Sequence, residues 1–326
     1  MKTIVYDRYG SPDVLRLEEL AKPNPTEDRI LVKVVAAATN AADWHYMRGS
    51  PAFARLAFGL TKPKTPRLGL DFAGVVEAIG PDVTAFKPGD AVFGAGVLGA
   101  FSEYHLAREK GTVHKPENVS FEDAAAVPTA GLTALQGLRD AANLQAGQRV
   151  LINGASGGVG TFAVQIAKCL GAEVTGVCSS SKVELTRKLG ADHVFDYTKE
   201  DFTRSGQQYD LIFDGAANYR MADYARVLKG AGQYVAFGFS TVGHMVGQMV
   251  VAAGLRSATS SQQFGMMPTT SVNQDDLRTL GEMLEKGQIK PLIDRRYPLE
   301  ETAAAIRYLE EGHARGKVMI NVAGAD

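Results

Sequence analysis

The sequence is poor in the features that mark secreted, membrane-spanning and nucleic-acid-binding proteins. Only two of its 326 residues are cysteines, Cys169 and Cys178, so we expect a reducing, cytoplasmic location and no disulfide framework. Lys and Arg number 35 against 36 Asp and Glu, which leaves no basic field to attract nucleic acid or an anionic membrane. No run approaches the ~20 apolar residues of a membrane-spanning helix. The first residues, MKTIVYDRYG, lack the apolar core of a signal peptide.

The sequence does contain an alternation of two patterns between residues 149 and 261. Short β-like runs read RVLIN, EVTGVC, HVFDY, DLIFD and GQYVAFGF, and helical patterns separate them. In the first helical stretch the apolar residues recur at helical spacing and form one stripe: Val159, Phe162, Ala163, Ile166, Ala167 and Leu170. Strands that alternate with helices predict right-handed crossovers and a parallel sheet.

The two ends of the sequence have a different pattern. Before residue 122, short apolar runs such as ILVKVVAAAT and FAGVVEAIG are broken by KPNP, GPD and KPGD, which predicts an antiparallel, barrel-like region. After residue 270 the pattern is mixed, with helix-like DDLRTLGEMLEKG and strand-like KVMINV. We therefore predict an α/β protein in which a parallel-sheet domain, residues 123–269, is inserted into a barrel domain formed by residues 1–122 and 270–326.

The stretch VLINGASGGVGT, residues 150–161, joins the first strand-like run to the first helix. A glycine-rich turn in this position lets the backbone approach a pyrophosphate, and the helix N-terminus offers free N–H groups. The usual GxGxxG fingerprint occurs here with alanine in the first place. A turn chosen only for tight packing is the alternative. The residues predicted to contact a dinucleotide are Ala155, Ser156, Gly157, Gly158, Val159 and Gly160.

Several motifs in order give the chain a resemblance to a known family. They read YGSPDVLRLEE, GLDFAGVVEAIG, KPGDAVFG, FSEYHL, AAAVPTAGLTAL, AGQRVLINGASGGVG and LGADHVFDY. In these motifs, over nearly its whole length, the chain resembles the medium-chain dehydrogenases/reductases, in their zinc-free quinone oxidoreductase branch. The resemblance implies a GroES-like β-barrel catalytic domain and a Rossmann cofactor domain. It also implies a homodimer.

The second strand-like run ends at VCSSSK without the carboxylate that usually binds the ribose of NADH. Hydroxyl groups at Ser179 and Ser180 and the charge of Lys182 suit a phosphate instead. The resemblance implies that this group, with Tyr197, cradles the 2′-phosphate of NADPH. The alternatives are a helix N-cap for the serines and a solvated position for Lys182.

A catalytic zinc normally has three protein ligands. The zinc branch of the family places Cys, His and Cys in its catalytic site. This sequence has Asn40, Leu70 and Ala126 at about those positions, so we predict no metal.

The expected reaction is hydride transfer from NADPH to a quinone or to the β-carbon of an α,β-unsaturated carbonyl, with the cofactor carrying the difficult step. Asn40 is the best candidate to lie near both the nicotinamide of the cofactor and the acceptor carbonyl, where its amide can stabilise a developing oxyanion, and a turn-stabilising Asn is the alternative. Tyr46 is a candidate proton donor. The resemblance places Thr129 near the nicotinamide, with a helix cap as the alternative. Further predicted cofactor contacts are Thr133, Phe237, Gly238, Ser240 and Lys317, although Lys317 also suits a solvated position.

Two further questions stay open at this stage. The segment GSPAFARLAFGLTKPKTPRLG, residues 49–69, carries a helical stripe of Phe53, Leu56, Ala57 and Leu60, which suits either a cap over an apolar pocket or ordinary core packing. The chain could also be an NADPH-binding sensor or partner-binding protein with little turnover, because the expected reaction requires no conspicuous catalytic group.

Overall fold

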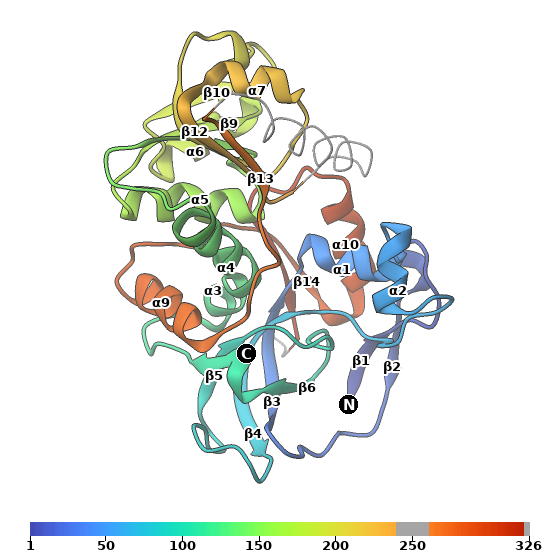
Figure 1. The fold of residues 1–326 in the computed structure, drawn as a ribbon. Helices are drawn as coiled ribbons and strands as arrows, with labels where there is room; N and C mark the ends of the chain where they lie inside the picture. Colours follow the sequence, from blue (N-terminus) through green and yellow to red (C-terminus); the bar gives the residue numbers. More distant parts are fainter. Residues whose placement is uncertain (239–260, 323–326) are drawn as a thin grey trace. The chain divides into compact units, whose positions relative to one another are not determined.

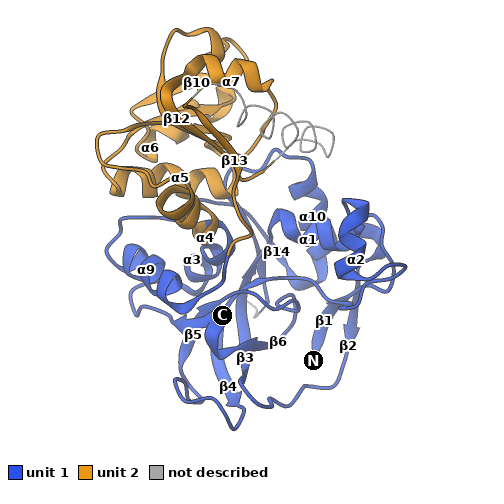
Figure 2. Ribbon diagram, viewed as in Figure 1, with its two compact units in different colours: residues 1–130, 271–326 blue, residues 131–270 orange. Residues whose placement is uncertain are grey.

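The protein is described from a computed structural model, which covers residues 1–238 and 261–322. The chain divides into two compact units (Figure 2): unit 1 comprises Met1–Ala130 and Ser271–Asp326, and unit 2 comprises Gly131–Thr270. Unit 2 is thus inserted between two segments of unit 1. The predicted boundary put residues 123–130 in the cofactor domain. In the structure α3 (Phe121–Ala126) packs against the sheet of unit 1, so these residues are grouped with that unit.

Unit 1 is built on a seven-stranded sheet with the order β14-β15-β3-β4-β5-β7, in which β6 also pairs with β3. Its pairings are antiparallel except for β14 with β15. The strands of this sheet are β3 (Arg29–Ala38), β4 (Asp71–Ile79), β5 (Ala91–Gly94), β6 (Tyr104–Arg108), β7 (Thr112–His114), β14 (Ile293–Pro298) and β15 (Lys317–Asn321). A separate antiparallel pair is formed by β1 (Lys2–Val5) and β2 (Arg16–Glu19). This agrees with the predicted barrel-like region (Figure 1).

In addition to α3, unit 1 contains the helices α1 (Ala41–Arg48), α2 (Arg55–Phe58), α9 (Gln274–Glu285) and α10 (Thr302–Glu310). The core combines residues from both segments of the unit, for example Val32 and Phe72 from the first and Ile306 and Val318 from the second. The tail is therefore an integral part of the barrel unit, because it completes the hydrophobic core.

Unit 2 contains a six-stranded sheet with the order β10-β9-β8-β11-β12-β13, and every pairing in it is parallel. The strands are β8 (Arg149–Asn153), β9 (Glu173–Cys178), β10 (His193–Asp196), β11 (Tyr209–Asp214), β12 (Leu228–Ala236) and β13 (Gln263–Met266). The helices are α5 (Gly158–Cys169), α6 (Val183–Lys188) and α7 (Met221–Val227), and α4 (Pro128–Gln136) crosses the boundary between the units. The alternating pattern predicted this doubly wound sheet.

Helix α5 forms where the sequence places the first apolar stripe. Phe162, Ala163, Ile166 and Ala167 are fully buried, which confirms the predicted inward face at these positions. No helix among the described residues is long and apolar enough to cross a membrane.

The segment of residues 50–70 contains one 3-10 turn, Ala52–Ala54, and the short helix α2. Phe53, Leu56 and Leu60 are 59%, 74% and 68% exposed, so core packing, one of the two alternatives, is wrong for these three side chains. Phe58 instead packs on Tyr46, with 4.2 Å between the ring centroids. A role of this segment as a substrate cap stays a prediction.

Candidate active site

A fully buried carboxylate, Asp71, organises the polar interior of unit 1. It is the first residue of β4 and has no exposed surface. Asn40 Nδ2 donates to its Oδ2 at 2.9 Å, and the backbone N–H of Thr129 donates to its Oδ1 at 3.1 Å. The Thr129 hydroxyl also donates to this carboxylate. Sequence reasoning missed Asp71, although a lone carboxylate within the apolar run GLDFAGVV was a signal for it.

Lys317, at the start of β15, points its ammonium group into the same cluster. Its Nζ lies 2.6 Å from Asn40 Oδ1, 3.1 Å from Thr39 O and 3.6 Å from Asp71 Oδ2. Three acceptors therefore surround the three N–H groups of the ammonium. The side chain is 2% exposed, so the alternative of a solvated lysine is wrong. A direct contact of Lys317 with a cofactor stays a prediction.

Burial controls the ionisation of this cluster, which we call the Lys317–Asp71 cluster and define as Asn40, Asp43, Asp71, Thr129 and Lys317. Burial raises the pKa of Asp71 and lowers that of Lys317, and the attraction between the two charges opposes both shifts. Asp43 accepts from the backbone N–H groups of Asn40 at 2.7 Å and Gly69 at 3.0 Å. Its burial nevertheless raises the pKa of Asp43 to about 7.

Asn40 uses both ends of its amide within the cluster. Besides its bonds with Asp71 and Lys317, Nδ2 contacts the carbonyl oxygen of Ala38 at 3.4 Å. This contact is long for a hydrogen bond. Of the two contacts of Nδ2, with Asp71 and with Ala38, the one with Ala38 is therefore the easier for another acceptor to replace. The predicted oxyanion-donor role of Asn40 stays a prediction with that N–H as its candidate atom.

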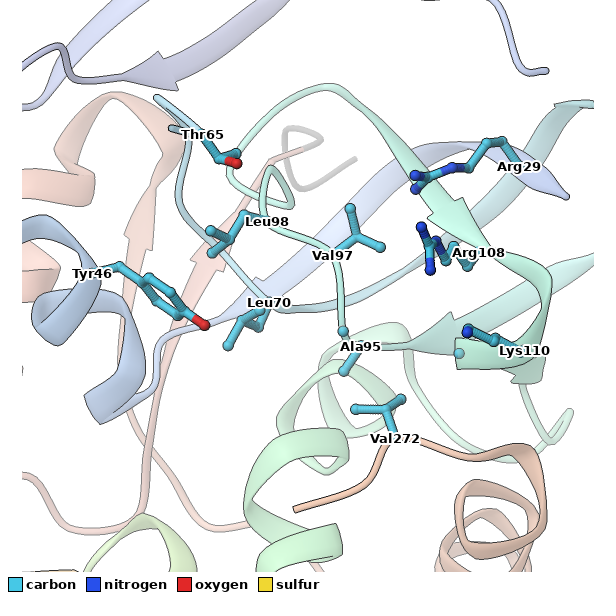
Figure 3. A pocket seen from close by; sticks show the side chains of 12 residues that line it. Arg29, Tyr46, Thr65, Leu70, Ala95, Val97, Leu98, Arg108, Lys110 and Val272 are labelled. Atoms are coloured by element: carbon cyan, nitrogen blue, oxygen red, sulfur yellow. The ribbon is translucent and has the colours of Figure 1, made fainter. Parts of the chain in front are cut away.

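Tyr46 lies on α1, half-buried, and its hydroxyl points into a cavity of unit 1 (Figure 3). Burial raises the pKa of its hydroxyl above the ordinary value for tyrosine, so the group holds its proton at neutral pH. The cavity has a volume of about 460 Å³. It is lined by Arg29, Tyr46, Thr65, Leu70, Ala95, Gly96, Val97, Leu98, Arg108, Lys110, Gly111 and Val272.

In unit 2 the turn between β8 and α5 contains several glycines, and the structure requires glycine at some of these positions but not at others. Gly154 adopts φ +83°, which favours glycine. A Cβ on Gly160 would lie 2.0 Å from the carbonyl oxygen of Gly154, so only glycine fits there. Gly157, with φ −83°, has neither constraint, since an added Cβ would meet only the Gly154 oxygen at 3.4 Å. Gly157 thus leaves room for an added group at the N-terminus of α5, as a pyrophosphate contact requires, and that contact stays a prediction.

The hydroxyl and lysine group predicted for the 2′-phosphate lies at the carboxyl ends of two neighbouring strands of unit 2. Cys178 of β9 pairs with Asp196 of β10, and the Tyr197 N–H donates to the Cys178 carbonyl oxygen at 3.1 Å. This register brings Tyr197 beside the segment of residues 179–182. The Tyr197 side chain is 54% exposed. The side chain of Ser179 makes no capping hydrogen bond, so a helix N-cap does not explain this serine.

Asp196 is a second carboxylate that sequence reasoning missed. It accepts from the Ser180 hydroxyl at 2.6 Å, and Lys199 Nζ lies 3.2 Å from it. Hydrogen bonds from Ser180 and Thr198 hold the pKa of the Asp196 carboxyl well below its usual range. Ser180 therefore has a structural partner in addition to its predicted phosphate contact.

The other predicted cofactor residues of unit 2 lie at several places. Thr133 Oγ1 is 3.1 Å from Thr270 Oγ1. Phe237 directly follows β12 and packs on Phe213 with 4.3 Å between ring centroids. A Cβ on Gly238 would lie 2.5 Å from the carbonyl oxygen of Gly215, so packing accounts for that glycine. Ser240 lies outside the described residues.

The residues at the ligand positions of the zinc branch do not fit a zinc ion. Asn40, Leu70 and Ala126, at about the ligand positions of the zinc branch, offer no thiolate and no imidazole. Among residues 1–238 and 261–322, no three His, Cys, Asp or Glu side chains are grouped so that they could hold a metal ion.

Comparison with known proteins gives matches along nearly the whole chain. Residues 26–117 match the alcohol dehydrogenase GroES-like domain, and residues 189–320 match the zinc-binding dehydrogenase family. An NADPH-dependent alkenal/one oxidoreductase, chloroplastic, of Arabidopsis thaliana is 35% identical over 98% of this chain and 79% of that protein.

Two solved structures have a similar fold over their full length. A quinone oxidoreductase of Coxiella burnetii has a TM-score of 0.87 and 31% identity, with 99% of both chains covered. The Escherichia coli quinone oxidoreductase in complex with NADPH has a TM-score of 0.85 and 26% identity, with 99% of this chain and 100% of that chain covered.

Proposed function

This chain belongs to the medium-chain dehydrogenase/reductase superfamily, in its quinone oxidoreductase branch, and from that membership we propose an NADPH-dependent reductase of quinones or α,β-unsaturated carbonyls. The observation that carries the proposal is the turn at Gly157, where bare backbone and the start of α5 leave space for a pyrophosphate. Relatives named as alkenal/one and quinone oxidoreductases support the acceptor class.

Cofactor binding is assigned to unit 2. The backbone from Ala155 to Gly160 holds the pyrophosphate, with the N–H groups at the start of α5 donating to it. Ser179, Ser180, Lys182 and Tyr197 hold the 2′-phosphate, and Lys182 provides the positive charge. Thr133, Phe237, Gly238 and Ser240 are proposed as further contacts. Bound NADPH supplies the hydride.

The acceptor is assigned to unit 1. We place its carbonyl oxygen at Asn40, where the Nδ2 N–H that now contacts Ala38 would donate to the developing oxyanion. The Tyr46 hydroxyl, which lines the cavity, donates the proton that completes the reduction. Thr129 and Lys317 hold Asn40 and Asp71 in place and are also proposed to contact the nicotinamide half of the cofactor.

Three finer points belong to the same proposal. The reductase works without metal, as a homodimer, in the cytoplasm. The location requires its own measurement, because a relative that this chain matches over 79% of its length is named as chloroplastic.

Turnover tests the proposal against the alternative of an NADPH-binding sensor. Oxidation of NADPH is followed with a panel of quinones and enones, before and after treatment with a chelator. We expect reduction of several members of the panel, with the rate unchanged by the chelator. Tight NADPH binding without turnover of any acceptor would favour the sensor instead.

A further inference from the structure

We propose that the cavity of unit 1 selects acceptors that carry an anionic group, such as a carboxylate, at the end remote from the reducible carbon. The inference rests on the proposed function, which places the reacting end of the acceptor between Asn40 and Tyr46. It adds a recognition site made by Arg29, Arg108 and Lys110.

The two ends of the cavity differ in chemistry. Tyr46, Leu70 and Leu98 lie toward one side, and Arg29, Arg108 and Lys110 lie together on the other (Figure 3). None of the described residues that line the cavity is acidic. An elongated acceptor with an apolar body and one anionic end matches this division, because cations recognise carboxylates by charge-assisted hydrogen bonds.

The positions of Arg29 and Arg108 indicate that these side chains bind an anionic ligand rather than stabilise the sheet. Arg29 of β3 and Arg108 of β6 are direct partners in the antiparallel register. Like charges opposite each other destabilise a sheet. The nearest counter-ion of Arg29 is Asp28 at 3.9 Å. In the part of the chain that the structure describes, Arg108 and Lys110 form no ion pair. A bound anion would offset this repulsion.

Neighbouring side chains show that the local field is positive. Glu109, between Arg108 and Lys110, accepts from the backbone N–H groups of Thr84 and Ala85, so its charge is engaged with that loop. His105 is buried, and burial together with the charges of Arg67 and Arg29 lowers its pKa to about 3. The cations are thus not balanced by a partner that faces the cavity.

The test compares two matched acceptors: a straight-chain enone that ends in a carboxylate, and its methyl ester. The measured quantity is the ratio of kcat/KM for the carboxylate to kcat/KM for the ester. We expect the wild type to prefer the carboxylate at least ~5-fold, and a rise in ionic strength to reduce that preference. Arg108→Gln and Lys110→Gln should each lower the ratio through KM, while Arg108→Lys, which keeps the charge, should retain most of it.

Lys33→Gln is the matched control. Lys33 is an exposed cation on the same strand as Arg29, and it does not line the cavity. It should leave the ratio unchanged. The saturated analogue of the carboxylate should compete with the acceptor. A ratio near one in the wild type, an equal effect of Lys33→Gln, or non-competitive inhibition by the analogue would overturn the anion site.

Failure of this inference is distinguishable from failure of the proposed function. If the ester is reduced with NADPH and the carboxylate is not preferred, the function stands and the anion site is wrong. If neither acceptor nor any quinone is reduced, the proposed function itself is wrong, and the anion site is overturned with it.

Discussion

The candidate sites of the two units are built from different chemical groups, backbone in unit 2 and buried charged side chains in unit 1. Unit 2 offers backbone: a turn in which Gly154 and Gly160 are required by conformation and packing and Gly157 leaves open space. Unit 1 offers buried charge, held by Lys317, Asp71 and Asn40. A backbone site tolerates no added side chain, whereas a charge cluster tolerates no missing partner. The two sites should therefore fail in different ways when they are mutated.

The largest effect is expected from Lys317→Met. The substitution leaves Asp71 buried without a counter-ion and removes the donor to Asn40 Oδ1. Removing one partner of a buried ion pair costs about 3–5 kcal/mol, so the free energy of unfolding should fall by about that amount in urea titrations. Lys33→Met, at an exposed site on β3, should change it by less than ~0.5 kcal/mol.

A double variant sharpens this expectation. Asp71→Asn combined with Lys317→Met removes both charges, so it should destabilise by clearly less than the sum of the single variants. Additive effects would show that the two side chains are not coupled, and the description of unit 1 as a charge-built site would have to be abandoned.

The next largest effect concerns the turn of unit 2. Gly157→Val should lower NADPH affinity at least ~100-fold, about 2.7 kcal/mol, because the new side chain occupies the space assigned to the pyrophosphate. Gly157 has φ −83°, so the substitution adds no left-handed backbone strain, and a loss of affinity reports on the cofactor. Titration of NADPH into variants with wild-type near-UV circular dichroism measures it.

Gly230→Val is the control for this experiment. Gly230 also lies in unit 2, and an added Cβ there would meet no atom within 4 Å. Gly147 is less suitable because it adopts φ +79°. If folded Gly157→Val binds NADPH like the wild type, the turn is a packing feature and the cofactor assignment loses its main support.

The same contrast explains what sequence reasoning could predict. The parallel sheet and the turn at Gly157 follow from local patterns, because strand periodicity and short crossovers fix them. The place of Tyr197 beside the segment after β9 follows only from the family resemblance. The Lys317–Asp71 cluster does not follow from local patterns, since residues 40, 71 and 317 meet only through the pairing of β15 with β3 and of β3 with β4, and residue 129 joins them from α4.

That limit accounts for the particular errors. Lys317 suited a solvated position because RGKVMI carries no sign of its partners, and only the fold supplies Asn40 and Asp71. Phe53, Leu56 and Leu60 suited core packing because their spacing is helical, but the helix that forms is α2, of four residues, and these side chains stay exposed. A periodic pattern predicts a face, while tertiary packing decides whether that face is covered.

A pH titration offers a smaller test of the charge cluster. Burial raises the folded-state pKa of Asp43 from 3.8 to about 7. Between these values Asp43 binds a proton in the folded state but not in the unfolded state, so its stabilising contribution is complete below about pH 4 and is lost as pH rises through about 7. The lowered pKa of His105 acts in the opposite direction, because the buried neutral ring favours the folded state more as pH rises toward 6.5. Asp71 shifts in the same direction, whereas the lowered pKa of Lys317 acts in the opposite direction and makes stability rise with pH.

The readout is the slope of the unfolding free energy between pH 5 and 8. We expect the wild type to lose about 2 kcal/mol more over this range than Asp43→Asn does, because the other groups titrate alike in both proteins. An identical slope in the two proteins would show that Asp43 does not titrate in this range.

The smallest effect is expected from a substitution at the position in unit 2 that is proposed to bind the 2′-phosphate. Lys182→Ala should weaken NADPH about 10-fold, about 1.4 kcal/mol, and leave NADH unaffected, because only NADPH carries the extra phosphate. A charged hydrogen bond contributes about 1.5–3 kcal/mol, and solvent around the partly exposed Lys182 reduces that value. Tyr197→Phe should act in the same direction more weakly.

Lys188→Ala is the control for Lys182→Ala. Lys188 lies at an exposed position on the neighbouring helix α6, so the substitution also removes one positive charge and should change the affinity for neither NADPH nor NADH. Dissociation constants measured for both cofactors decide the point. An equal loss for NADPH and NADH in Lys182→Ala would show that the lysine does not recognise the phosphate, and the hydroxyl groups of Ser179, Ser180 and Tyr197 would remain as the proposed contacts.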